Sequence, residues 1–343
     1  MTNIKKIGLS ALAGALAMTS AHAGSLAVSG AMEVSYTKGG SGSTTGAHTT
    51  GNPLGQNNEI SFTGSGELDN GVTVAYKRTT TDTTMTNDSE LVFGNVLGGT
   101  VAFQSTGSPL DGIDNKMPTA FNDAEGAVGS IADVSGDSGT FGIRYTLSDL
   151  GGSGIKLDYN YVPKHGTGDA TGDGGPGGDG AAAGNKDAHD IVLTGSVPGV
   201  EGLNFGAGYS RRNYDNKNTA LNSDSREDGT VYLTYAIGPV TVGVQQGRQG
   251  DAAAGDGTWY KNDYVGISYA VTDDLSIAYN NTRSNKETGT YNGADVEQEW
   301  DNISLAYSMG GMTIGVSDSD CSNCSYTSGL SQEETIINLT VAF

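Results

Sequence analysis

The chain has 343 residues, of which 54 are Gly and 36% are hydrophobic, and its 18 Lys and Arg stand against 39 Asp and Glu for a net charge of −21. Such an acidic chain is unsuited to binding nucleic acid or an anionic membrane surface, and it favours cations. So few apolar residues would leave a globular domain of this length short of core, whereas a barrel filled with water has no such core to fill.

Residues 1–23 have the pattern of a secretory signal peptide. Lys5 and Lys6 precede an apolar run over residues 7–18, and Ala21-His22-Ala23 offers the small residues that signal peptidase reads. The run is too short to span a bilayer. Because this segment holds two lysines and no acid, its removal leaves 320 residues with a net charge of −23.

The rest of the chain consists of segments in which apolar and polar residues alternate with the period of a β-strand. We predict sixteen strands, at 25–37, 56–68, 71–80, 89–96, 99–106, 138–148, 153–163, 189–197, 202–212, 227–237, 239–248, 261–271, 274–284, 297–309, 311–319 and 333–343.

Short connections alternate with long ones between these strands. Seven tight turns supply Gly, Asn or Asp, near 69–71, 97–99, 149–152, 198–202, 238–239, 272–274 and 310–311. Eight longer polar loops lie near 38–55, 81–88, 107–137, 164–188, 213–226, 249–260, 285–296 and 320–332. Both chain ends therefore fall on the side of the short turns.

Each strand has one apolar and one polar face. In the first, Val28, Met32 and Val34 share one side, while Ser29 and Glu33 take the other. Tyr repeatedly ends an apolar run, where its amphipathic ring suits the headgroup level of a bilayer. The apolar faces are therefore expected to contact lipid.

The last strand ends the chain on an aromatic residue. Its apolar side consists of Ile337, Leu339, Val341 and Phe343. In hydrocarbon every backbone N–H and C=O must be paired within the protein, so the strands must close into a barrel. Sixteen strands enclose an interior too wide for side chains to fill, which predicts an all-β transmembrane antiparallel barrel around an aqueous channel.

The signal peptide, the sixteen alternating strands, the eight long loops and Phe343 together resemble a Gram-negative general diffusion porin of the trimeric type. The resemblance covers residues 24–343. It implies an outer-membrane barrel with short periplasmic turns, long extracellular loops and a third loop folded into the lumen. It further implies a homotrimer, and a Phe343 that the outer-membrane assembly machinery reads. The family's third-loop motif, Pro-Glu-Phe-Gly-Gly, is missing, so the resemblance carries over the position of this loop and not the roles of single residues.

The resemblance places a constriction in the third loop, residues 107–137. The acids of this loop are Asp111, Asp114, Asp123 and Glu125. By parity, the wall bases that face the lumen are Lys77, Arg144, Lys156 and Arg212. Acids opposite bases would give a transverse field that orients dipolar solutes. The alternatives, solvated loop carboxylates and lumen bases away from the constriction, stay open.

Four arginines fall on the outward parity near the long-loop ends of their strands: Arg78, Arg211, Arg248 and Arg283. In that position they could pair with lipid phosphates at the membrane border. A register error of one residue would exchange Arg211 with Arg212.

The last long loop contains Cys321-Ser322-Asn323-Cys324. An exported chain passes through an oxidising compartment and no second CxxC is present to complete a zinc site, so we expect a disulfide that pins this loop. The segment 166–184 places Asp169, Asp173 and Asp179 among many Gly, without the regular period of calcium-binding repeats. A solvated loop is favoured there over a specific Ca²⁺ site, and weak divalent-cation bridging of acidic loops to lipopolysaccharide stays open. We predict no cofactor and no metal site.

Catalytic groups are scarce. His48, His165 and His189 lie in or beside predicted loops, and no barrel wall is expected to carry a plausible His base. We therefore expect no enzyme but a passive channel for small hydrophilic solutes and ions that prefers cations. Two alternatives stay open. One is a substrate-specific channel, for which Tyr232 and Tyr264 are the lumen-side aromatics; the other is an adhesin or structural barrel without an open pore.

Overall fold

The computed structural model describes residues 26–39, 52–81, 89–121, 131–136, 141–165, 185–214, 225–250, 259–287 and 295–343. The strands are β1 (Ala27–Gly39), β2 (Leu54–Glu67), β3 (Thr73–Thr81), β4 (Ser89–Val96), β5 (Gly99–Gln104), β6 (Gly142–Leu147), β7 (Ile155–Val162), β8 (Asn185–Ser196), β9 (Leu203–Tyr214), β10 (Ser225–Ile237), β11 (Val240–Gly250), β12 (Trp259–Ala270), β13 (Leu275–Glu287), β14 (Val296–Met309), β15 (Met312–Ser322) and β16 (Ser331–Ala342). In these ranges, the short 3-10 helices η2 (Asp111–Ile113) and η3 (Cys324–Tyr326) lie in loops. No helix in these ranges is long and apolar enough to cross a membrane. The predicted signal peptide lies outside the described residues.

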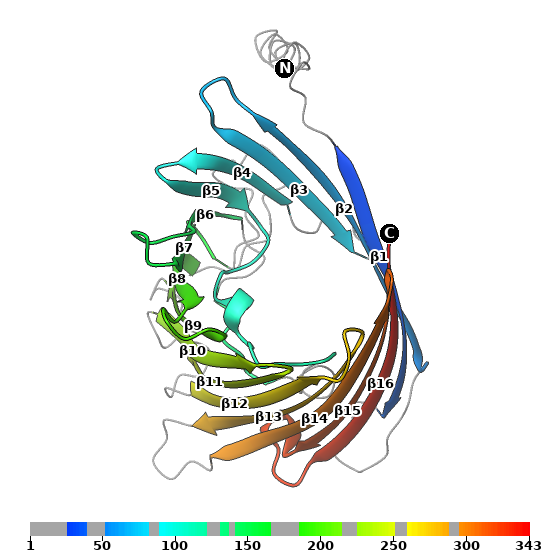
Figure 1. The fold of residues 1–343 in the computed structure, drawn as a ribbon. Coiled ribbons are helices and arrows are strands. Elements are labelled where there is room, and N and C mark those ends of the chain that lie inside the picture. The colour runs from blue at the N-terminus through cyan, green and yellow to red at the C-terminus, as the bar shows by residue number, and fades with distance from the viewer. Residues whose placement is uncertain are drawn as a thin grey trace, which may run out of the picture.

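The sixteen strands form one closed antiparallel barrel, which confirms the predicted fold class (Figure 1). Every strand pairs with its neighbours in sequence, and β1 closes the ring against β16. At the seam, the Phe343 N–H donates to the Gly30 carbonyl and the Gly30 N–H donates to the Phe343 carbonyl, both at 2.9 Å. The ladder therefore continues to the last residue, and no strand edge is left open.

The tight turns fall where the sequence predicts them. Between β4 and β5, Val96 pairs with Gly99, and the two central residues Leu97 and Gly98 have φ of 51° and 80°. Positive φ at both central positions is the geometry of a type I′ turn, which matches the right-handed twist of the flanking strands. Gly98 adopts it without strain, whereas Leu97 accepts the left-handed region and points its side chain outward, 89% exposed.

The two faces of the wall differ as the parity argument predicts. On β14, Asn302 and Ser304 are buried inside the barrel, while Ile303 and Leu305 are exposed outside. The inner polar groups bond to one another across strands, since the Ser317 hydroxyl donates to Asn302 Oδ1 at 2.7 Å. An apolar exterior around a polar interior is the reverse of a soluble core and is typical of a barrel that holds water within lipid.

Candidate functional site

The third loop, between β5 and β6, turns into the barrel and lies against its inner wall (Figure 1). Its first limb, residues 108–121, is held on β11 by Gln245. The Lys116 N–H donates to Gln245 Oε1 at 2.8 Å, and Gln245 Nε2 donates to the Ile113 carbonyl at 2.9 Å. A single wall amide therefore pairs both a donor and an acceptor of the loop backbone, which a loop inside a barrel needs.

Two further wall side chains continue this attachment. Asn280 Nδ2 on β13 donates to the Pro118 carbonyl at 2.9 Å, and the Ala120 N–H donates to Ser304 Oγ on β14 at 3.3 Å. The first limb therefore follows the inner wall from strand to strand and does not cross the lumen freely.

Inward glycines make room for the first limb. They are Gly208, Gly243, Gly266 and Gly315. A Cβ on Gly208 would lie 2.5 Å from Leu110, and a Cβ on Gly243 would lie 2.6 Å from Pro118, closer than real Cβ atoms come to other atoms. Sequence reasoning missed this space for the loop. Its signal in the sequence is glycine at inward-facing positions of several nearby strands.

The return limb of the third loop, residues 131–136, covers the two aromatics predicted on the lumen side. The Tyr264 hydroxyl donates to Asp133 Oδ1, and Tyr264 is only 1% exposed. Tyr232 packs against a buried cluster that includes Val134 of this limb. Both rings therefore support the loop, so they do not form an aromatic track for a sugar-like solute.

The acids of the first limb lie at the start of its path along the wall. Asp111 begins η2 and has an exposed side chain, and Asp114 follows η2 half-exposed. Partial removal from bulk water raises the pKa of Asp111 above its ordinary 3.8, and the Asp133 and Asp190 carboxylates raise it further. The other two predicted acids, Asp123 and Glu125, lie outside the described residues.

This raised pKa predicts that the ion selectivity of the channel shifts toward anions as pH falls. The Asp111 carboxylate is charged at pH values above its raised pKa and is protonated as the pH falls through that pKa. The midpoint of this loss of charge therefore lies above the ordinary value of 3.8. Reversal potentials measured from pH 7 downwards should show a step in the wild type that is reduced in Asp111→Asn. Identical titrations of the two proteins would contradict the prediction.

Two of the predicted wall bases share a carboxylate that sequence reasoning missed. Arg144 on β6 and Lys156 on β7 lie 3.2 and 2.8 Å from Asp158, whose side chain is 4% exposed. The sequence signal was parity, because Lys156 and Asp158 are two residues apart on one face of a strand. Lys77, on β3, forms no ion pair with any described residue.

Arg212, the fourth predicted base, takes the inward parity but is partly buried. Its guanidinium lies 2.7 Å from Asp228 on β10, and Arg226 lies 3.0 Å from the same carboxylate, which is fully buried. Arg212 projects from β9, the strand on which Leu110 of the first limb also packs. The structure therefore separates Arg212 from Lys77, Arg144 and Lys156, which project from β3, β6 and β7.

The outward arginines have partners within the protein. Arg211 lies 3.9 Å from Glu227, Arg283 lies 2.8 Å from Glu299, and Arg248 stacks 4.5 Å from the centre of the Trp259 ring. Arg78 is exposed on the outward parity of β3. Pairing of these arginines with lipid phosphates stays a prediction.

The strand predicted to begin at His189 begins four residues earlier, so His189 lies within β8, on the outer face of the wall. Its Nδ1 is 2.7 Å from the Tyr159 hydroxyl and its Nε2 is 2.7 Å from Asp187 Oδ2. The wall thus carries an imidazole whose two nitrogens both have hydrogen-bonding partners, but neither partner is a Ser or Cys nucleophile.

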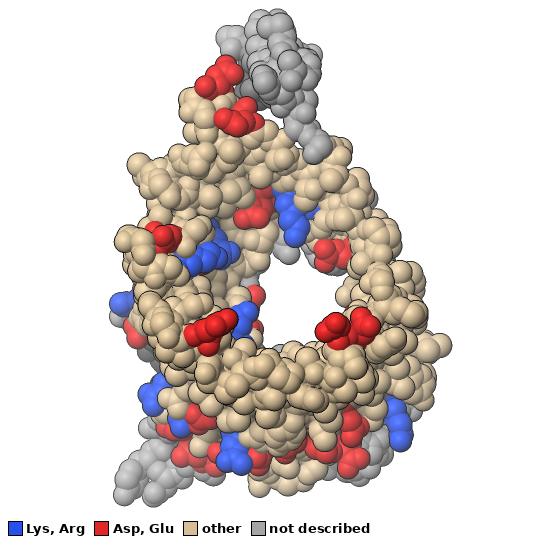
Figure 2. Space-filling model, in the orientation of Figure 1, with Lys and Arg blue, Asp and Glu red and all other residues tan. Residues whose placement is uncertain are grey.

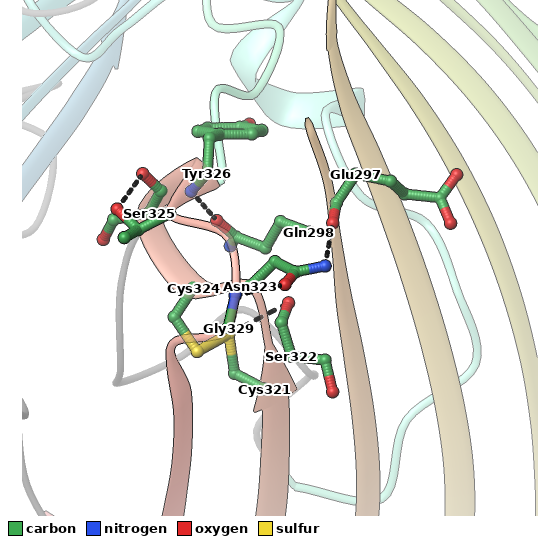
Figure 3. The surroundings of a disulfide bond; sticks show 10 residues. Glu297, Gln298, Cys321, Ser322, Asn323, Cys324, Ser325, Tyr326 and Gly329 are labelled. Carbon is green, nitrogen blue, oxygen red and sulfur yellow. Dashed lines mark hydrogen bonds between the residues drawn. A yellow bond between two sulfur atoms is a disulfide. The ribbon is translucent and has the colours of Figure 1, made fainter. Parts of the chain in front are cut away.

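Cys321, near the end of β15, and Cys324, at the start of η3, form a disulfide with an S–S distance of 2.18 Å (Figure 3). The turn that it closes has unusual backbone geometry, since Asn323, Ser325 and Tyr326 have φ of 52°, 52° and 54°. Left-handed conformations of residues other than Gly are costly and persist where the surroundings impose them. A short covalent ring is one such constraint.

Side-chain and backbone contacts hold this turn against β14. Asn323 Nδ2 donates to the Glu297 carbonyl at 2.9 Å, and Asn323 Oδ1 accepts from the Gly329 N–H at 2.9 Å. The Tyr326 N–H donates to Gln298 Oε1 at 3.2 Å, as Figure 3 shows. The disulfide itself packs on the buried ring of Trp300, a lumen-side aromatic that sequence reasoning missed.

No group of three or more His, Cys, Asp and Glu in the described ranges could hold a metal ion. The segment with Asp169, Asp173 and Asp179, considered for Ca²⁺, lies outside those ranges.

The molecule is open along the barrel axis. Figure 2 shows a passage through the barrel with both acidic and basic residues at its edge. A closed sixteen-stranded wall, apolar outside and polar inside, with a loop folded against its inner surface, defines a channel of the bacterial outer membrane. The chain belongs to the Gram-negative porin family, whose sequence pattern it matches over residues 8–315.

Solved structures share this fold. The anion-selective porin from Comamonas acidovorans is 11% identical, with a TM-score of 0.65 over 93% of this chain and 100% of that one. OmpF of Salmonella typhi in complex with daunomycin is 15% identical, with a TM-score of 0.64 over 93% and 97%. A loop L8 deletion mutant of Vibrio cholerae OmpT is 10% identical, with a TM-score of 0.65 over 93% and 99%. No curated protein matches the chain.

Proposed function

We propose that this porin passes small hydrophilic solutes and ions by passive diffusion and prefers cations. The observation that carries the proposal is the third loop, which brings Asp111 and Asp114 into a lumen where Arg144, Lys156 and Arg212 each have a carboxylate partner. Asp158 offsets part of the charge of Arg144 and Lys156. The net charge of −21 adds a long-range attraction for cations.

The geometry favours a field across the lumen. Asp111 and Asp114 lie on the part of the limb beside β8, β9 and β11, and Lys77 projects from β3 on another arc of the wall, whereas Arg144 and Lys156 project from the nearer β6 and β7. Opposite charges on different arcs of a wall orient dipolar solutes and slow apolar ones. Selection would then depend on charge and size, as general diffusion requires.

Reversal potential in planar bilayers under a salt gradient tests the cation preference. We expect a cation-selective potential, which moves toward zero in the double variant Asp111→Asn, Asp114→Asn because two fixed negative charges leave the lumen. The double variant Asp273→Asn, Asp274→Asn is the matched control, since it also removes two negative charges, from the exposed turn between β12 and β13. Clear anion selectivity of the wild type would overturn the proposal.

The same recordings separate the alternatives. Saturable block by one solute would favour a substrate-specific channel, and absence of conductance from folded protein would favour an adhesin or structural barrel. The proposal also includes a homotrimer, supported by a trimer form described for Vibrio cholerae OmpT. Closure in three equal steps would support three channels in each assembly.

The remaining parts of the proposal concern partners and chemistry. We expect contact with outer-membrane lipid and lipopolysaccharide, insertion by the outer-membrane assembly machinery, at most weak Ca²⁺ binding at acidic loops and no enzymatic activity. The array of Tyr159, His189 and Asp187 is the place to test the last point. Hydrolase assays on ester substrates should give equal background rates for the wild type and His189→Ala.

A further inference from the structure

The turn closed by the disulfide, residues 321–326, contacts the return limb of the third loop. The Ala132 N–H of that limb donates to the Tyr326 hydroxyl oxygen at 3.0 Å. The neighbouring Ile131 is buried in one cluster with Trp300 and both cysteines. Two loops that are nearly 200 residues apart in the sequence therefore share a polar and an apolar contact inside the barrel.

The polar contact belongs to a closed ring of hydrogen bonds. The Ser284 hydroxyl donates its single proton to Asn262 Oδ1 at 2.6 Å, so at 2.6 Å from Tyr326 it can only accept. Tyr326 therefore donates to Ser284 and accepts from Ala132. Asn262 Nδ2 completes the ring by donating to the Ala132 carbonyl at 2.9 Å.

Every member of this ring donates to the next, an arrangement in which each bond polarises and strengthens its neighbours. Both backbone groups of Ala132 are satisfied by it. Burial raises the pKa of Tyr326 above its ordinary 10, so the phenol keeps the proton that it gives to Ser284. Only Tyr326 comes from outside the wall strands and the third loop, so it is the member whose position another element must fix.

The disulfide fixes that position. Its two sulfurs are buried and it links residues 321 and 324, so Asn323 lies within the covalent ring, and Ser325 and Tyr326, which also take left-handed conformations, follow it directly. Without the covalent link, we expect the extended and right-handed conformations that Ser and Tyr prefer to become more accessible, and the bond from the Tyr326 N–H to Gln298 to hold the phenol in the ring less well. The Cys321–Cys324 bond is therefore expected to affect the position of Tyr326, two residues after Cys324.

We propose that the disulfide turn is a positioning element for the third loop, in which the Cys321–Cys324 bond sets Tyr326 and Tyr326 holds the return limb against β12 and β13. The placement of the return limb does not depend on the proposed function. Only the expected effect on conductance rests on the proposal that the third loop forms the constriction. The first limb has its own attachments to Gln245, Asn280 and Ser304, so loss of the turn should loosen the return limb around Ala132 selectively, although Tyr264 still binds Asp133.

Hydrogen exchange measured by mass spectrometry on the folded protein tests the placement directly. In Tyr326→Phe, and in the double variant Cys321→Ser, Cys324→Ser, we expect peptides over 131–136 to exchange roughly fivefold faster or more, the usual effect of losing one net hydrogen bond. Peptides over 113–120 should keep wild-type rates. Tyr307→Phe is the matched control, because Tyr307 lies on the outer face of β14.

Channel recordings on the same proteins separate the positioning role of the disulfide turn from the role of the third loop as the constriction. Faster exchange together with altered conductance or current noise supports both the positioning role and the constriction. Faster exchange with unchanged conductance supports the positioning role and counts against the constriction. Wild-type exchange over 131–136 in Tyr326→Phe and in reduced wild-type protein would overturn the inference, and the reduced sample covers the case in which the double variant does not fold.

Discussion

Replacing Asp228 by Ala should destabilise the barrel by about 3–5 kcal/mol, the cost of leaving buried charges without their partner. The Asp228 carboxylate is fully buried and accepts from Arg212 Nη2 at 2.7 Å, from Arg226 Nε at 3.0 Å and from the Gly250 N–H at 3.2 Å. Its removal leaves two guanidinium groups close together with exposures of only 14% and 19%. Equilibrium unfolding in denaturant from lipid vesicles measures the loss.

Glu227→Ala supplies the control for this prediction. Glu227 is the residue before Asp228 in β10, is 53% exposed on the outer face, and lies 3.9 Å from Arg211. An exposed ion pair of this kind contributes about 0–1 kcal/mol. If both variants lost the same small amount of stability, the buried cluster of Arg212, Arg226 and Asp228 would not have the importance assigned to it.

Deleting Phe343 should impair assembly into the outer membrane more than it impairs conduction. A chain that ends at Ala342 loses both backbone hydrogen bonds to Gly30, about 2 kcal/mol at the one seam that closes the ring. It also loses the aromatic ring, which lies over Gly30 so closely that a Cβ there would be 2.9 Å from Phe343 Cε2. The deletion therefore removes the final rung of the ladder and the proposed recognition signal together.

Phe343→Tyr separates these contributions, because it keeps the backbone pairing and an aromatic end. We expect Phe343→Tyr to reach the outer membrane at near wild-type levels, and the deletion to accumulate unfolded, as judged by fractionation and by heat-dependent migration on gels. Channels that the deletion variant does form should show wild-type conductance, since Phe343 lies on the outside, 76% exposed. Normal assembly of the deletion would contradict the proposed signal.

The strand ends show where sequence reasoning reaches its limit. The strand predicted from residue 189 begins at Asn185, and the one predicted to end at 284 continues to Glu287. Outside the bilayer both faces of a strand meet water, so apolar and polar residues no longer alternate and the signal disappears. His189 therefore marks the start of the predicted strand but lies four residues inside the observed one.

The sequence by itself determined the sixteen strands, their turns, their closure and which face meets lipid, because a wall between hydrocarbon and water imposes a period of two on every strand. Only the tertiary structure decided what the lumen contains. The pairing of Arg212 with Asp228, the fit of Leu110 over Gly208 and the contact of Tyr326 with Ala132 join residues on different strands or loops. Such contacts depend on register and on the path of a loop, which the alternation of a single strand does not encode.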